Sequence, residues 1–258
     1  MLYTLAFILG GIWGSFCNVC IYRLPLEKNI IKGRSFCTSC EKQINWYDNI
    51  PLLSFIFLKG KCRCGKSKIN LQYFLVELVS AISFVLIYYL YGISITTLLL
   101  IILTIFFIII FFIDLKHYII PNVITFPLMA LGFLKSFDPH LNPIFPNYIN
   151  SLIGGVFGYG IIWSIIFFYK QVRKKEGMGL GDAKLFGVIG FWFGWLAIPF
   201  VIFLSSVIAL ISVVPALMKN SKKLSEMSTF ERVVRLVKNP HRLLSQELMV
   251  RRHSLCLK

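Results

Sequence analysis

Long apolar runs without charge alternate with short polar segments along this chain. A helix of about 20 apolar residues is long enough to cross the roughly 30 Å hydrocarbon core of a bilayer. The pattern predicts seven transmembrane helices, at residues 2–22, 73–91, 96–113, 120–137, 151–169, 183–197 and 198–217. We therefore expect an all-α polytopic membrane protein whose core is a bundle of about seven transmembrane helices.

The pattern defines some of these helices less sharply than others. Pro121 and Pro127 should delay or bend the helix at 120–137, because proline lacks a backbone N–H and clashes with the preceding turn. The run at 183–197 is short, and no polar segment separates it from the next run. Residues 1–22 lack a basic start and a small-residue cleavage site, which indicates a first membrane helix and not a cleavable signal peptide.

Composition and charge agree with a membrane protein. The chain is 57% hydrophobic, with a mean hydropathy of +0.75 and a formal net charge of +16. Of the 27 Lys and Arg residues, 10 fall in residues 23–72, five in residues 170–184 and 10 after residue 217. Basic residues gather in this way in the cytoplasmic loops of membrane proteins. The charge therefore indicates topology and not a nucleic-acid surface.

The same charge pattern predicts how the chain is organised in a cytoplasmic (inner) membrane. Residues 1–22 form a first transmembrane helix with the N-terminus outside, and residues 23–72 form a cytoplasmic loop rich in cysteine. Residues 73–217 form the membrane-embedded core, and residues 218–258 form a basic cytoplasmic tail. The tail is either a helix lying on the anionic inner leaflet or a disordered segment.

Four cysteines of the cytoplasmic loop form two closely spaced pairs, Cys37 with Cys40 and Cys62 with Cys64. Two such pairs about 20 residues apart have the spacing of a structural zinc site, in which four thiolates surround Zn²⁺. Two disulfides are the competing interpretation, which a reducing cytoplasm disfavours. The second pair is C-x-C and not C-x-x-C, so the turn is tighter than in a usual knuckle. We expect a small zinc-knuckle loop that the metal helps to fold.

The remaining cysteines give weaker signals. Cys17 and Cys20 have C-x-x-C spacing but lie inside the first predicted helix, where buried small side chains are the simplest interpretation. Cys256 lies in the basic tail and has no evident partner.

Two aspartates lie at the predicted cytoplasmic edge of the membrane. Asp114 ends the run at 96–113, and Asp182 follows three glycines, Gly177, Gly179 and Gly181. Ionisable residues at such positions are costly and indicate function by default. Two carboxyls that share a site cannot both ionise readily, so one can activate water while the other donates a proton. This chemistry hydrolyses a peptide bond, and the glycines would let the loop approach an extended substrate.

Other interpretations of these residues remain open at this point. Asp182 could be only an N-cap of the next helix, and Asp114 could be only an interface anchor beside Lys116 or His117. The glycines lack the G-K-[ST] ending of a phosphate-binding loop. A small transporter with an aspartate ion path would place its acids near the bilayer midplane, whereas both acids here are predicted at one face.

The chain resembles the type IV prepilin leader peptidases, a family of membrane aspartic proteases with a G-x-G-D type motif. The resemblance extends over roughly residues 9–215 and rests on six stretches in order. These are "GSFCNVCIYRLP", "CTSC", "NWYDNIPLLSFIFLKGKCRC", "VELVSA", "IDLKHYIIPN" and "GMGLGDAKL". One departure is at the C-terminal end, where Pro215 precedes a charged tail and the family generally continues into a last apolar segment.

The resemblance implies a function for several residues. Asp114 and Asp182 would be the catalytic pair, and Gly177, Gly179, Gly181 and Lys184 would support it as the rest of the motif. Substrates would be prepilins or pseudopilins, cut on the cytoplasmic side after a glycine. Longer family members also methylate the new N-terminus with S-adenosylmethionine. The cysteine loop accompanies that activity, and Gly60 matches a glycine associated with it.

The leading hypothesis is therefore a membrane-bound prepilin peptidase that is also an N-methyltransferase. The alternative is a catalytically degenerate homologue that acts as an assembly or binding component of a pilus or secretion system. An intact pair of Asp114 and Asp182 favours the enzyme. The expected partners are prepilin substrates and the lipid bilayer, without nucleic acid, and the sequence does not define an oligomeric state.

Overall fold

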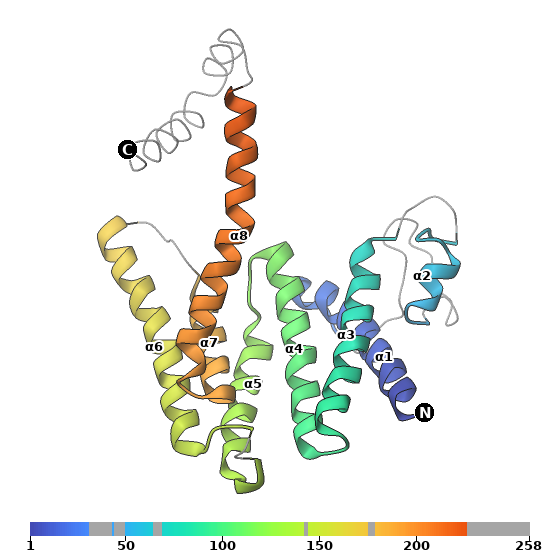
Figure 1. The fold of residues 1–258 in the computed structure, drawn as a ribbon, viewed down its shortest axis with the longest axis horizontal. Coiled ribbons are helices and arrows are strands. Elements are labelled where there is room, and N and C mark those ends of the chain that lie inside the picture. The colour runs from blue at the N-terminus through green and yellow to red at the C-terminus, as the bar shows by residue number, and fades with distance from the viewer. Residues whose placement is uncertain (31–42, 44–49, 64–68, 142–143, 175–178, 226–258) are drawn as a thin grey trace. The chain divides into compact units, whose positions relative to one another are not determined.

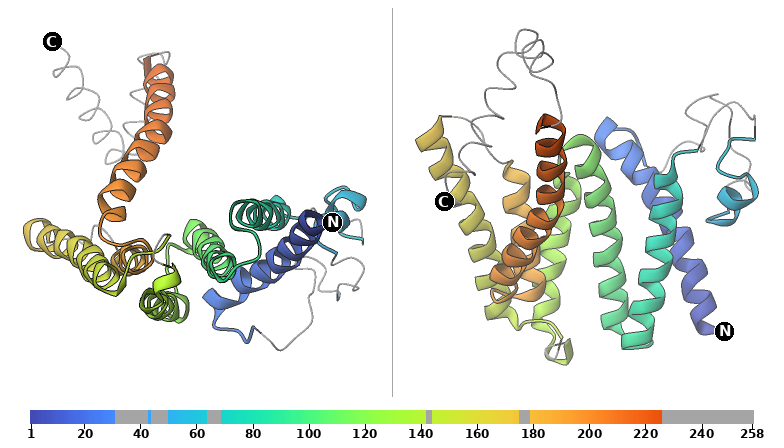
Figure 2. Two further views of the ribbon diagram at one scale, coloured as in Figure 1. Left: turned by 60° about the horizontal axis from the view of Figure 1, so that its bottom comes forward. Right: turned by 45° about the horizontal axis from the view of Figure 1, so that its top comes forward.

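The computed structural model describes residues 1–30, 43, 50–63, 69–141, 144–174 and 179–225. Within these residues the regular structure is helical and there is no strand. Residues 1–198 form one compact unit, and residues 199–258 form a second. Figure 1 shows the chain as a ribbon, and Figure 2 gives two further views.

Five helices in the described part of the chain are long and apolar enough to cross a membrane. They are α1 (Leu2–Arg23), α3 (Leu71–Tyr91), α4 (Ile95–His117), α6 (Tyr148–Arg173) and α8 (Ala197–Ser225). Three helices are shorter: α2 (Leu53–Phe57), α5 (Asn122–Leu134) and α7 (Leu180–Phe193). Single turns of 3-10 helix lie at η1 (Leu24–Leu26), η3 (Lys135–Phe137) and η4 (Pro139–Leu141).

The all-helical fold is confirmed, but the predicted number of seven membrane helices is not. Helices form at all seven predicted runs, yet α5 and α7 are too short to count among the five candidates. Pro121 is the extended N-cap residue that delays the start of α5, and Gly194, at φ +79°, ends α7. With 14 residues, α7 is only about 21 Å long.

The N-terminal helices α1, α3 and α4 pack side by side, as Figure 1 shows. Gly10 and Gly14 of α1 lie directly against the backbone of α3. A Cβ atom at Gly10 would be 2.7 Å from Ala81 Cα, and one at Gly14 would be 2.7 Å from Glu77 Cα. Small residues four apart let two helices approach this closely, as in many membrane proteins.

The helix α7 packs against α6 and α5. Gly154 of α6 and Gly190 of α7 bring the two backbones into contact, so that neither position has room for a Cβ atom. Trp192 is fully buried, and its Nε1 donates a hydrogen bond to the carbonyl of Leu128 on α5 (2.8 Å). Ser151 Oγ likewise donates to the carbonyl of Phe191 (2.7 Å). These contacts fix the C-terminal end of α7.

Two buried apolar clusters connect the N-terminal helices to this second group. One cluster extends from α1 and α3 through Ile113 of α4 to Ile124 of α5, with Leu185 of α7 packed against it. The other joins Leu103 of α4 to Trp192 of α7. Helix α4 belongs to both clusters, so its last turn has a defined position relative to α5 and α7.

Candidate active site

Asp114 lies in the last turn of α4, three residues before the helix ends. The helix stops because Tyr118 adopts a left-handed conformation (φ 55°) and donates its N–H to the carbonyl of Asp114 (2.9 Å). The preceding residue, Ile113, is fully buried, whereas the side chain of Asp114 is exposed. The C-terminal end of α4 therefore has a buried face, on which Ile113 lies, and an exposed face, on which the carboxyl of Asp114 lies.

Asp182 lies in the first turn of α7 and is half-buried. The N-cap residue of α7 is Gly179, so the interpretation of Asp182 as an N-cap is wrong. Asp182 is three residues further on, and its backbone N–H donates to the carbonyl of Gly179 (3.3 Å). A carboxylate in a first turn is favoured by the helix dipole.

The loop between α4 and α5 brings the two aspartates near each other. A Cβ atom at Gly181 would be 3.0 Å from Ile120 Cβ, so the first turn of α7 packs on this loop. Lys184 Nζ donates a hydrogen bond to Asn122 Oδ1 across a distance of 2.6 Å. As a result Asp114 and Asp182, which are far apart in sequence, interact electrostatically.

The environment of Asp182 favours its protonated form. Burial raises the pKa of Asp182 above its ordinary value, and the nearby charge of Asp114 raises it further. Asp182 lies outside the five candidate membrane helices. When two carboxyls lie close together, the one that retains its proton can act as a general acid. The other, which is ionised, can accept a proton as a general base.

The glycines before Asp182 have different positions. Gly177 lies outside the described residues. Gly179 has space around it, because a Cβ atom there would meet only the backbone N of Gly181, at 3.9 Å. Gly181 is in tight contact with Ile120, so a side chain at that position would push α7 away from the loop.

Two contact residues of this site were absent from the predicted set. Asn122 begins α5 and is the partner of Lys184, and Ile120 is the surface on which Gly181 packs. Both lie in the stretch "IDLKHYIIPN". The signal that could have identified Asn122 is its polar amide, which directly follows a proline at the predicted cytoplasmic edge.

The predicted zinc site falls mostly outside the described residues, because Cys37, Cys40 and Cys64 are not among them. Cys62 is half-buried, and no group of metal-binding side chains occurs in the part of the chain that the structure describes. Gly60 has a left-handed conformation (φ 68°), and a Cβ atom there would be 3.2 Å from the Phe55 ring. Gly60 therefore serves a tight turn after α2.

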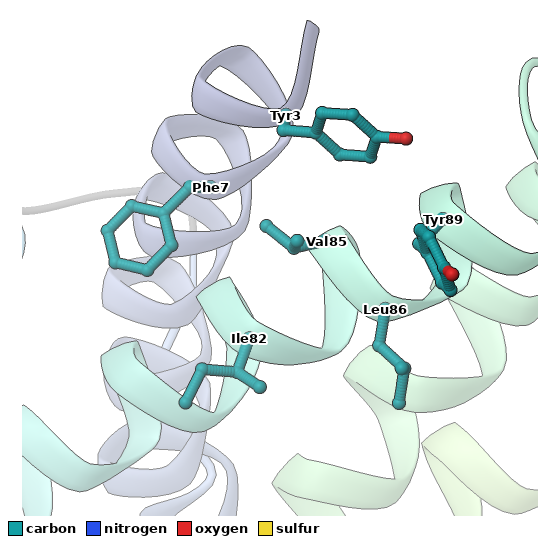
Figure 3. Close-up of a pocket in the computed structure, with 6 residues that line it drawn as sticks. All are labelled: Tyr3, Phe7, Ile82, Val85, Leu86 and Tyr89. Carbon is teal, nitrogen blue, oxygen red and sulfur yellow. The ribbon is translucent and has the colours of Figure 1, made fainter.

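Other predicted features of the N-terminal helices can be compared with the structure. Cys17 and Cys20 are buried free thiols in α1, as expected. An apolar pocket lies between the N-terminal part of α1 and the C-terminal part of α3, and Figure 3 shows the side chains that line it. Its only polar groups are the hydroxyls of Tyr3 and Tyr89. The side chains that line this pocket include no carboxyl, imidazole or thiol group.

The comparisons with known proteins cover both halves of the chain. Residues 8–91 match the family model of the bacterial peptidase A24 N-terminal domain, and residues 101–214 match that of the type IV leader peptidase family. The two matches together include all of α2, α3, α5, α6 and α7 and most of α1, α4 and α8.

Several curated relatives have the name prepilin leader peptidase/N-methyltransferase. A relative from Klebsiella pneumoniae is 37% identical over 206 residues, covering 78% of this chain and 89% of the relative. One from Neisseria gonorrhoeae is 36% identical over 234 residues (81% and 80%), and one from Vibrio cholerae is 38% identical over 212 residues (79% and 82%). No solved structure matches the chain.

Proposed function

Because this chain belongs to the type IV leader peptidase family, we propose that it cleaves the leader peptide from prepilins or pseudopilins and N-methylates the new N-terminus. The substrate class follows from the name that its relatives share. The observation that carries the proposal is the packing of Gly181 on Ile120, in the loop that follows Asp114, which brings Asp182 close enough for the charge of Asp114 to raise its pKa.

Asp114 and Asp182 act as an acid–base pair in the proposed cleavage. The raised pKa of Asp182 suits it to hold the proton, which leaves Asp114 as the base. The base takes a proton from water as the water oxygen attacks the scissile carbonyl carbon. The acid gives its proton to the nitrogen that leaves, and the peptide bond breaks.

The proposed cleavage takes place at the cytoplasmic face of the membrane. Asp114 lies at the C-terminal end of α4, beside Lys116 and His117 in the last turn. Basic residues next to a membrane helix favour the cytoplasmic side. Protease added to one side of sealed, oriented vesicles would check this orientation. The loop that follows α4 should be cut only when the protease is on the cytoplasmic side.

The proposed methyl transfer belongs to the N-terminal part of the chain, residues 8–91. Its methyl donor would be S-adenosylmethionine, a co-substrate that the family resemblance implies. Cys37, Cys40, Cys62 and Cys64 provide four soft thiolates, which are the donor set that a structural zinc ion prefers. Zinc would hold the cytoplasmic loop in its folded form.

The test is a cleavage assay with purified protein and a prepilin, followed by mass spectrometry of the product. Asp114→Asn and Asp182→Asn should each lower cleavage by a factor of 1,000 or more, roughly, because each removes one partner of the acid–base pair. Asp138→Asn is the matched control, since Asp138 follows η3 in another loop. Its cleavage rate should equal that of the wild type.

Two outcomes would contradict this proposal. Cleavage retained by either aspartate variant would remove that residue from the mechanism. Absence of cleavage by the folded wild-type protein would favour the alternative, a catalytically degenerate homologue that acts as a component of a pilus or secretion system.

A further inference from the structure

A second polar cluster lies between α1 and α3, within the apolar part of the N-terminal helices. At its centre is Glu77, the seventh residue of α3 and about 9 Å along the helix axis from Leu71. Glu77 Oε2 accepts a hydrogen bond from the backbone N–H of Leu52 (2.8 Å), and the side chain of Ser15 on α1 also donates to this carboxyl. A carboxyl inside a membrane helix is costly, and such residues are usually functional.

Two buried side chains near Glu77 have oxygen atoms without a hydrogen-bond partner. Asn18 of α1 is 5% exposed, and its Nδ2 donates to the carbonyl of Tyr73 (3.0 Å), one turn before Glu77. Its Oδ1 has no partner. Ser80 lies three residues after Glu77, is 0% exposed, and its Oγ has no partner either. Buried polar atoms in native proteins nearly always have partners, so this surplus of acceptors needs an explanation.

The backbone near this cluster is also strained. Leu52, which donates to Glu77, has a left-handed φ of 61°, and such a conformation is rare for leucine. Pro51 packs on α1, where a Cβ atom at Gly11 would be 3.3 Å from Pro51 Cβ. Strained residues persist where the surrounding structure holds them, and they gather at functional sites. Pro51 and Leu52, directly before α2, therefore lie against the polar cluster.

The chemistry of the cluster indicates the kind of ligand that fits it. Glu77 provides negative charge, and Asn18 and Ser80 provide further acceptors on the two sides of Glu77 along the helix pair. Among the described residues, no basic side chain forms an ion pair with Glu77. A primary ammonium group has one positive charge and three N–H donors, which complements this set.

We infer that Glu77, Asn18 and Ser80 form the site that binds the free α-ammonium group of the cleaved substrate before its methylation. This inference rests on the proposed function, because cleavage creates that ammonium group.

The reaction at this site would proceed as follows. An N–H proton of the ammonium group passes to the carboxylate of Glu77. The nitrogen lone pair then forms a bond to the methyl carbon of a methylsulfonium co-substrate, and the carbon–sulfur bond breaks with its electron pair retained by sulfur. The product is an N-methylammonium group, and the proton on Glu77 later returns to solvent. Charge and atoms balance, and no oxidant or reductant is needed.

The first test compares Glu77→Gln with wild type in lipid nanodiscs. One readout is the ratio of methylated to cleaved product by mass, and the other is binding of a labelled peptide with the mature N-terminal sequence. Wild type should bind the free-amine peptide about tenfold or more tightly than its N-acetylated form, because a charged hydrogen bond is lost on acetylation. Glu77→Gln should lose this preference and lower methylation by at least the same factor.

Glu27→Gln is the matched control, because Glu27 is the other carboxyl among the described residues of the N-terminal domain and is exposed. It should retain both the preference for the free amine and the methylated fraction.

A second variant, Ser80→Ala, separates the proposed role from a purely structural one. Removal of a buried oxygen without a partner should raise the melting temperature. The same change should lower methylation by roughly three- to tenfold, because the ammonium group loses one acceptor. A role only in folding predicts that stability and methylation change in the same direction.

The inference is overturned if Glu77→Gln retains the preference for the free amine. It is also overturned if Glu77→Gln fails to fold and Ser80→Ala methylates the substrate as well as wild type does. A third contradicting outcome is that folded wild type binds the free-amine peptide no more tightly than the acetylated one. These outcomes leave the proposed cleavage intact. Loss of cleavage in the wild type, by contrast, contradicts the proposed function and not the amine site, which the peptide-binding assay tests separately.

Discussion

At the scale of single residues, the site depends on a few polar groups whose surroundings differ. Asp114 is exposed at a helix end, and Asp182 is half-buried in a first turn beside it. This difference supports the separate acid and base roles that we propose for two chemically identical side chains. Lys184 and Asn122 connect the first turn of α7, which carries Asp182, to the start of α5.

Asp114→Asn should lower the pKa of Asp182. Part of the upward shift of that pKa comes from the negative charge of Asp114, and its removal stabilises the ionised form of Asp182. Infrared titration of protein with labelled aspartate would follow the midpoint of Asp182 in both proteins. Burial, the larger cause, is unchanged in the variant, so the pKa should stay above that of an ordinary aspartate. An unchanged midpoint would show that the two carboxyls do not interact.

Lys184→Met and Asn122→Ala should each lower kcat for cleavage about five- to tenfold with little change in KM. The hydrogen bond between Lys184 Nζ and Asn122 Oδ1 connects α7 to α5, and an exposed charged contact of this kind contributes at most about 1 kcal/mol. The double variant should be no slower than either single variant, because both remove the same contact. Lys174→Met, on the end of α6, is the control. Additive effects would mean that the two residues act independently.

At the scale of helices, close backbone contacts decide where the functional residues lie. Gly10 and Gly14 join α1 to α3, and Gly154 and Gly190 join α6 to α7. Without side chains between them, these helix pairs have little freedom to change their spacing. The position of Asp182 is therefore set from both ends of α7, by the glycine contact with α6 and by the packing on Ile120.

Gly190→Ala should destabilise the protein by about 1–3 kcal/mol and lower cleavage, because the new Cβ atom would overlap the backbone of Gly154. Thermal unfolding in detergent, followed by the fluorescence of buried tryptophan, measures the stability. Gly160→Ala on α6 is the matched control, since a Cβ atom there meets nothing within 4 Å. That change should be neutral or stabilising by roughly 0.5–1 kcal/mol. Equal effects at the two positions would argue against a close α6–α7 contact.

At the scale of the whole molecule, the sequence predicts the helical class well and the contacts between helices poorly. Apolar runs define α1, α3, α4, α6 and α8 because length and composition determine a membrane helix. Helix α7 ends at Gly194, which has a positive φ of 79° and lies against Pro146, a residue distant in sequence. The pair of Asp114 and Asp182 remains a prediction as a catalytic unit, although their electrostatic interaction supports it.

Contacts between distant residues explain most of what the sequence did not predict. Asn122 meets Lys184 only because α5 and α7 pack together. Asn18 of α1 and Ser80 of α3 lie near each other's helix only because α1 and α3 pack together. Neither fact can be read from spacing along one helix, since both depend on which side chains a neighbouring helix presents.

The short length of α7 has a consequence for the membrane around it. A helix of about 21 Å is roughly a third shorter than the hydrocarbon core of an average bilayer. Lipids adapt to such hydrophobic mismatch by locally thinning. If α7 lies in the membrane as the sequence predicts, thinning next to it would bring headgroups and solvent toward the turn that carries Asp182, and the proposed hydrolysis consumes one water molecule for each bond cut. Acyl-chain length would then be a variable of the proposed catalysis, and we expect cleavage to be slower in thick bilayers than in thin ones.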